Sequence, residues 1–282
     1  MKLRVVLALC GLSALCLLPA VYAQDETKEA PKEAPKEAPK GPQMDEVSKK
    51  LLENWDKSTY HLGRLGVKKA SCKAKMSVSQ MGQQMVGNLT YKWDGEKGTI
   101  EWDNPQMGAM LSRGGGLQQR FDEDFNREPL MDQFGTAKCT AKATETGHVV
   151  TVDGKTKAGF KSFTFDKDGV LTQLAMEMVG QMGPQKITMK LNYTKVAGKY
   201  LMSSQNGEIE GGMGLMGLAI KFTYTTVGDF QVKQKQVTNI SMGGNPMGSH
   251  TLDYTDWKLN DAVDAPPPTA PKPPAPEKTE EK

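Results

Sequence analysis

Residues 70–79 read ASCKAKMSVS, so that apolar and polar side chains alternate along the whole segment. The same period of two recurs in successive segments as far as Leu259, with a turn after each one. Successive side chains of a β-strand point to opposite faces, so each segment predicts a strand with one apolar and one polar face. No helical pattern long enough for a parallel crossover separates the segments. The sequence therefore predicts a mainly β protein with a single large curved sheet that is antiparallel throughout.

Turn residues between the alternating segments predict hairpins. Leu89, Tyr91 and Trp93 run into Asp94-Gly95, and Trp102 closes the returning segment. An Asp-Gly pair between two alternating runs is typical of a tight β-turn. Further strands are expected around Ala137–Ala143, His148–Val152, Phe163–Phe165, Leu174–Met178, Ile187–Tyr193, Ile220–Tyr224, Phe230–Val232 and Leu252–Leu259.

Two helices are expected on the apolar face of this sheet. Asp45 or Ser48 can cap an N-terminal helix that places Val47, Leu51 and Trp55 on one face and ends near Ser58. A short second helix is expected at 117–125, with Leu117, Phe121 and Phe125 on one side. The sheet is therefore predicted to cover both helices.

The two ends of the chain differ in composition from the rest. Residues 1–23 combine a basic start, an apolar run and a small-residue cleavage site, which predicts a signal peptide and an extracytoplasmic or periplasmic location. Residues 24–43 contain the repeat Lys-Glu-Ala-Pro, and residues 264–282 are rich in proline, lysine and glutamate; both are expected to be extended, solvated segments. One folded domain is expected over residues 44–263.

Only Cys72 and Cys139 would remain after removal of the signal peptide. Both lie on the apolar side of their strands, and export would permit a disulfide bond between them. Two separate buried thiols are the alternative. The sequence leaves both open.

No residue pattern indicates an enzyme, a cofactor or a metal centre of the usual kind. His61, His148 and His250 are far apart and lack metal-ligand spacing, and no strand-turn nucleophile motif is present. The adjacent residues 122–124, Asp-Glu-Asp, are expected to form a solvated patch. Loss of Lys2 and Arg4 with the signal peptide lowers the net charge from +3 to +1, and the remaining cations are scattered. Nucleic acid and strong binding to anionic membranes are therefore not expected, nor is an integral membrane protein.

Methionine is the unusual residue of this chain. There are 17, and seven precede glycine: Met81, Met107, Met182, Met213, Met216, Met242 and Met247. Three interpretations remain open. The side chains can fill the core, line an adaptable site for apolar ligands, or bind Cu(I) through Met213, Met216, Met242, Met247 and His250.

Two stretches resemble the outer-membrane lipoprotein-sorting proteins, the family of LolA-like periplasmic lipoprotein carriers. Residues 87–93 with 101–105, GNLTYKW and EWDNP, are similar to the family's early hairpin, and residues 254–260, YTDWKLN, are similar to its closing strand. The resemblance implies a half-open barrel of about eleven strands, curved over helices that act as a lid above an apolar cavity for acyl chains. An arginine often found before the hairpin tryptophan is here Glu101.

These observations predict an exported, non-enzymatic carrier or sensor that binds a lipid, a lipoprotein acyl chain or another apolar ligand between sheet and helices. A structural or interaction protein of the cell envelope with a filled core is the alternative, and either protein could meet an envelope partner through its proline-rich ends. The expected lining residues are Tyr91, Trp93, Trp102, Phe163, Phe165, Met176, Met178, Met189, Leu191, Phe222 and Tyr224.

Overall fold

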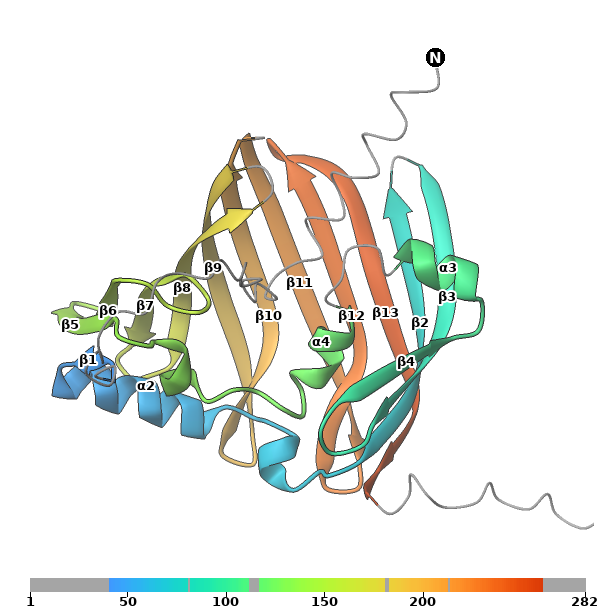
Figure 1. The fold of residues 1–282 in the computed structure, drawn as a ribbon, viewed down its shortest axis with the longest axis horizontal. Coiled ribbons are helices and arrows are strands. Elements are labelled where there is room, and N and C mark those ends of the chain that lie inside the picture. The colour runs from blue at the N-terminus through green and yellow to red at the C-terminus, as the bar shows by residue number, and fades with distance from the viewer. Residues whose placement is uncertain (1–40, 81, 112–116, 181–182, 213, 261–282) are drawn as a thin grey trace, which may run out of the picture.

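The computed structural model describes residues 41–80, 82–111, 117–180, 183–212 and 214–260. Within these residues the chain forms one 13-stranded sheet with a few short helices (Figure 1). The strands are β1 (Gln43–Met44), β2 (Ala70–Gln80), β3 (Gln83–Trp93), β4 (Gly98–Trp102), β5 (Lys138–Thr144), β6 (Gly147–Asp153), β7 (Phe160–Asp166), β8 (Leu171–Gly180), β9 (Gly183–Val196), β10 (Lys199–Gly211), β11 (Gly214–Val227), β12 (Phe230–Met242) and β13 (Asn245–Leu259). The helices are α2 (Glu46–Ser58), α3 (Pro105–Leu111) and α4 (Leu117–Asp122), with 3-10 turns η2 (Gly63–Leu65) and η3 (Leu130–Gln133).

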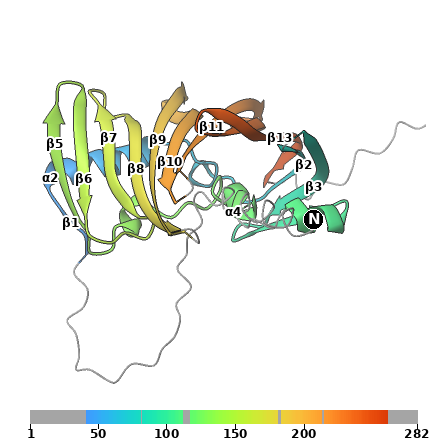
Figure 2. The same cartoon turned by 90° about the horizontal axis from the view of Figure 1, so that it is seen from above.

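The strand order is β1-β5-β6-β7-β8-β9-β10-β11-β12-β13-β2-β3-β4, so most neighbours in sequence are also neighbours in the sheet. The sheet curls, with β5 and β6 at one end, β2 and β3 at the other and α4 between them (Figure 2). Buried residues on each strand alternate with exposed ones, as on β2, where Ala70, Cys72, Ala74, Met76 and Val78 are buried. The predicted fold class, a mainly β protein with one large curved sheet over an N-terminal helix and a short second helix, is confirmed.

Three details of the sheet differ from the prediction. The pairing is not antiparallel throughout, because Gln43 and Met44 pair in parallel with Lys138 and Cys139. The strand count is 13 rather than about eleven. Strand β10 was not predicted, because the polar run Ser203–Asn206 interrupts the apolar alternation between Leu201 and Ile209.

Helix α2 begins and ends at the expected residues but presents a different face. Asp45 is the N-cap and accepts a hydrogen bond from the Ser48 amide, while the helix ends at Ser58. Ser48, Leu52 and Trp55 are buried, whereas Val47 is 48 % exposed. The predicted buried face of Val47, Leu51 and Trp55 is therefore wrong at its first position. Asp45 also accepts a hydrogen bond from the Ala141 amide on β5, which ties the start of the helix to the sheet.

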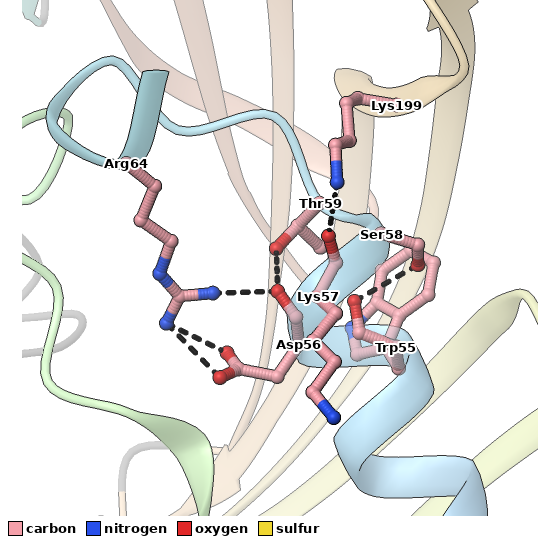
Figure 3. Close-up of polar contacts among 7 residues, drawn as sticks. All are labelled: Trp55, Asp56, Lys57, Ser58, Thr59, Arg64 and Lys199. Carbon is pink, nitrogen blue, oxygen red and sulfur yellow. Dashed lines mark hydrogen bonds and ion pairs between the residues drawn. The ribbon is translucent and has the colours of Figure 1, made fainter. Parts of the chain in front are cut away.

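The C-terminal end of α2 is fixed to the sheet through its last carbonyl groups (Figure 3). Arg64 donates to the Asp56 carbonyl and forms an ion pair with the Asp56 carboxylate, and Lys199 of β10 donates to the Lys57 carbonyl at 2.6 Å. These cations satisfy carbonyls that have no partner inside the helix and lie at the negative end of its dipole. The Trp55 ring packs edge-on against Tyr193 at 4.9 Å, which anchors α2 on β9.

Cys72 and Cys139 are both buried free thiols. They belong to different apolar clusters, and strands β6 to β13 lie between β5 and β2 in the sheet. Of the two alternatives left open by the sequence, the structure contains two separate buried thiols and not the disulfide bond.

Candidate functional site

The inner, concave face of the sheet carries two apolar clusters, each beneath a helix. The α2 cluster joins Leu52 and Trp55 of α2 to inward side chains from β5 through β12, with Phe134 next to η3 at its centre. The α4 cluster joins Leu117 and Phe121 of α4 to side chains of β2, β3, β12 and β13. The expected single cavity is thus replaced by two covered areas of one continuous sheet face.

Ten of the eleven residues expected to line a cavity are divided between these clusters, and Tyr224 belongs to neither. Tyr91 and Trp93 are buried in the α4 cluster, and Trp102 packs against it half-buried. The α2 cluster contains Phe163, Phe165, Met176 and Leu191 as buried members, with Met178, Met189 and Phe222 packed half-buried at its surface. Tyr224 is half-buried next to Phe222 and donates a hydrogen bond to the Met202 carbonyl at 2.7 Å.

Half-buried apolar side chains cross the concave face from β8 to β13. Most of them point inward because they lie two residues from a buried inward residue on the same strand, whereas Met202 and Met247 lie next to β-bulges. This apolar strip consists of Met178, Met189, Met202, Phe222, Met242 and Met247. These six side chains lie on six adjacent strands but not at one level, since Met242 pairs with Met216 whereas Phe222 lies six residues further along β11. Met202, Met242 and Met247 were not among the expected lining residues, although the Met-Gly pairs at 242 and 247 marked two of them.

Helix α3 lies on the inner face at β3 and β4 because glycines allow close contact with Trp102. A Cβ atom at position 108 would overlap the Trp102 ring from the helix side. One at position 87 of β3 would meet Trp102, Leu111 and Met107. The indole is therefore held between the helix and the strand, and bulk at either glycine would displace α3.

Aromatic stacking and one buried hydrogen bond hold α4 on the sheet. The Phe121 ring stacks on Tyr91 at 4.5 Å, and Phe125 stacks on Trp93 at 5.5 Å. The Tyr91 hydroxyl donates to Asp122 Oδ1 at 2.8 Å, which a Cβ at Gly98 would obstruct. The expected short helix at 117–125 forms over Leu117–Asp122 and so ends three residues early, while Leu117, Phe121 and Phe125 are all buried.

Polar side chains lie beneath α4 on an otherwise apolar face. Gln236 and Thr238 of β12 are buried, and His250 of β13 is opposite Thr238 in register. With Arg120 of α4 they line a cavity of about 20 Å³, completed by Met76, Leu111, Leu117 and Leu252. Burial, and secondarily Arg120, lowers the pKa of His250, which keeps its imidazole neutral. The cavity has room for about one water molecule.

The acidic residues after α4 are half-buried and paired, which the expectation of a solvated patch did not anticipate. Asp124 forms an ion pair with Lys233 of β12 at 2.8 Å. Burial raises the pKa of Glu123 to about 7, and nearby Lys233 partly offsets this. His61 packs behind the same loop, and burial lowers its pKa to about 3. The sequence did contain a signal for this: Phe121 and Phe125 flank the acidic residues, and burial of both phenylalanines places the residues between them against the sheet.

The methionines considered as copper ligands come partly together. Met216 of β11 and Met242 of β12 are partners in the ladder, and Met247 lies on the same inner face. Met213 lies outside the described residues. Within the described part of the chain, no group of three or more His, Cys, Asp or Glu side chains is arranged to hold a metal ion.

Comparison of the sequence with family models and with curated proteins finds no match. Three solved structures are similar in fold and each covers about three quarters of this chain. A LolA superfamily protein from Nitrosomonas europaea aligns with 12% identity and a TM-score of 0.37, over 77% of this chain and 95% of its own. An outer membrane lipoprotein-sorting protein domain from Vibrio parahaemolyticus aligns with 8% identity and a TM-score of 0.34, over 77% and 93%. A DUF1329 family protein from Desulfovibrio piger aligns with 9% identity and a TM-score of 0.29, over 76% and 92%. The solved structures similar to this chain thus include the family that its early hairpin and closing strand resemble.

Proposed function

We propose that this protein is an exported, non-enzymatic carrier or sensor that binds an acyl chain along the apolar strip. The observation that carries the proposal is the set of half-buried side chains on the concave face, one on each strand from Met178 on β8 to Met247 on β13. Each methylene that a ligand buries there contributes about 0.8 kcal/mol. Methionine suits such a surface because its flexible thioether adapts to ligands of different shape.

The cavity under α4 continues this strip, because Phe222 is the ladder partner of Gln236. At about 20 Å³ the cavity is far smaller than an acyl chain, so a chain that extends beyond the strip must displace α4. To move, the helix must break two contacts, the stacking of Phe121 on Tyr91 and the Tyr91–Asp122 hydrogen bond. Helix α4 would then act as the lid of the site.

The proposed location and partners follow from the ends of the chain. Residues 1–23 would direct export, and the segments 24–43 and 264–282 would serve as solvated tethers to the envelope or to a partner there. All three lie wholly or largely outside the described residues. Within the described part of the chain, no helix is both long and apolar enough to cross a membrane.

The first test is mass spectrometry of the full chain purified without detergent. Copurified lipid in near-stoichiometric amount supports the carrier. Titration of the lipid-stripped protein with the fluorescent fatty acid parinaric acid, with oleate as competitor, then locates the site. The double variant Met189→Ser/Phe222→Ser should weaken binding by at least about tenfold, since each loses apolar contact with the ligand.

Val237→Ser is the matched control, because Val237 lies on β12 next to Gln236 but on the outer face of the sheet. It should bind parinaric acid as the unaltered chain does. Equal affinities of the double variant and the control, with both folded by circular dichroism, would exclude the strip as the site.

A filled core favours a second function, that of a structural or interaction protein of the cell envelope. The small volume under α4 and the close contact of α3 with Trp102 are the observations on that side. That protein would contain no copurified lipid and would not bind parinaric acid, so the same measurements separate the two functions.

A further inference from the structure

One edge of the sheet is built from four hairpins that contain no charged residue. The β2–β3, β8–β9, β10–β11 and β12–β13 connections lie at the same edge, because they alternate along an antiparallel sheet and Gly248 of β13 pairs with Gln80 of β2 (the upper edge in Figure 1). The residues that form this edge lack Asp, Glu, Lys, Arg and His over the spans 76–91, 178–185, 211–220 and 236–249. We call this edge the uncharged rim.

The opposite edge has the reverse character. Its turns contain Asp94 with Lys97, Asp168, Lys199 and Asp229. The rim ends at β8, because the next connection at this edge, loop 154–159 between β6 and β7, contains two lysines. Charge is therefore distributed along the strand direction, and only one end of the curved sheet is free of it.

The alternation of the strands fails at the uncharged rim. Val86, Val179 and Leu215 point outward and are exposed, with Val179 at 80 %. Each adjoins an inward methionine, so both faces of its own strand are apolar there. Leu215 pairs with Glu210 of β10, which marks the border of the rim on that strand. Met110 of α3, next to the β3 side of the rim, is exposed as well. Among the described residues, the other large exposed apolar side chains are Val47 and Leu65, near the opposite edge.

Packing of the core does not require these outward apolar side chains, because a polar residue would serve the fold equally well at positions that face water. Charge complementarity points to an uncharged partner. The side chains follow an arc of hairpin ends rather than a flat patch, and a fluid acyl layer can fill the spaces between such ends without a matching groove. Exposed apolar side chains spaced along an uncharged edge are typical of a surface that inserts shallowly into lipid.

We propose that the uncharged rim, represented by Val86, Met110, Val179 and Leu215, rests on a neutral lipid surface. Binding depends on apolar contact, so it persists at high salt, unlike attraction to anionic headgroups. The inference goes beyond the proposed carrier function, because contact of the rim with a bilayer needs no ligand on the apolar strip.

Cosedimentation of the full chain with phosphatidylcholine vesicles, at low and at high salt, tests this proposal. The triple variant Val86→Ser/Val179→Ser/Leu215→Ser should lower the vesicle partition coefficient by at least about tenfold. The matched control Val47→Ser/Leu65→Ser alters exposed apolar residues at the other edge and should bind as the unaltered chain does. Residues 1–23 are present in all three proteins and do not contribute to the difference.

A fluorophore reports directly which edge meets the lipid. In a Cys10→Ser/Cys16→Ser background the remaining native thiols are buried, so nitrobenzoxadiazole attached to Leu215→Cys or Val47→Cys labels one position. A blue shift on vesicle addition at position 215 but not at position 47 is the expected result. Equal partition of the two serine variants, the absence of a shift at position 215, or a concentration-dependent dimer that the triple variant abolishes without vesicle binding would overturn the proposal. Parinaric acid binding is measured separately, so failure here leaves the carrier function standing.

Discussion

The hydrogen bond between Tyr91 and Asp122 offers a direct test of α4 as a lid. Tyr91 is fully buried, and its hydroxyl donates to Asp122 Oδ1 at 2.8 Å while its ring stacks on Phe121. Tyr91→Phe retains the stacking and removes only this bond. A hydrogen bond to a charged group contributes about 1.5–3 kcal/mol. When α4 lifts, Asp122 can form hydrogen bonds with water instead. The substitution therefore destabilises the closed state and leaves the open state unaffected.

Each 1.4 kcal/mol corresponds to a factor of ten in an equilibrium, so Tyr91→Phe should increase opening of α4 by about tenfold to a hundredfold. Native-state hydrogen exchange with mass spectrometry measures this increase. The amides of Asp124 and Phe125, which donate to the carbonyls of Phe121 and Asp122, should exchange faster by the same factor. Parinaric acid should also bind more tightly if opening precedes binding, because a larger share of the molecules is competent.

Tyr224→Phe is the control, since it removes a tyrosine hydrogen bond of similar length to the Met202 carbonyl within the sheet. It should leave exchange at residues 121–126 unchanged. Unaltered exchange there in Tyr91→Phe, or equal acceleration in both variants, would refute the account of α4 as a hinged lid fastened by Tyr91.

Three further changes probe the neighbouring contacts. Gly108→Ala should lower the free energy of unfolding by about 1–3 kcal/mol and shift tryptophan fluorescence, because the new Cβ overlaps Trp102; unchanged emission would show that α3 adapts without moving. The low pKa of His61, about 3, means that stability is present above pH 6.5 and declines as the pH falls from there toward 3, so His61→Gln should flatten this decline in urea midpoints measured between pH 7 and 5. The raised pKa of Glu123, about 7, has the opposite sign, because its contribution is lost as the pH rises from about 4.5 to 7. Glu123→Gln should therefore raise the urea midpoint at pH 8 and leave it unchanged at pH 4.5, and an equal gain at both values would contradict burial as the cause.

Much of the local structure could be predicted because it depends on neighbouring residues. Alternation identified the apolar face of β2, and Asp94-Gly95 identified the turn between β3 and β4. Asp45 was correctly expected as a helix cap because its side chain reaches an amide three residues ahead. Each of these features is decided within one turn or one hairpin.

The sequence was a weaker guide where distant strands impose the structure. Strand β10 forms despite a polar run because β9 and β11 supply hydrogen bonds on both sides. The start of α2 is tied to β5 by the hydrogen bond that the Ala141 amide donates to Asp45, a residue 96 positions earlier in the chain. A disulfide bond between Cys72 and Cys139 was possible because both cysteines lie on the apolar face of their strands. The alternation of apolar residues does not show how many strands separate the two cysteines in the sheet.

The sequence by itself determined the fold class, the positions of the turns and which side chains of most strands face inward, since a period of two and turn residues act over a few positions. It also contained the charge-free spans, although not their meaning. Only the tertiary structure decided that the inner face holds two clusters, that Asp124 pairs with Lys233, and that four uncharged hairpins meet at one edge. These features depend on strand order and on the curvature of the sheet, which bring together residues far apart in the chain and are not written in any local pattern.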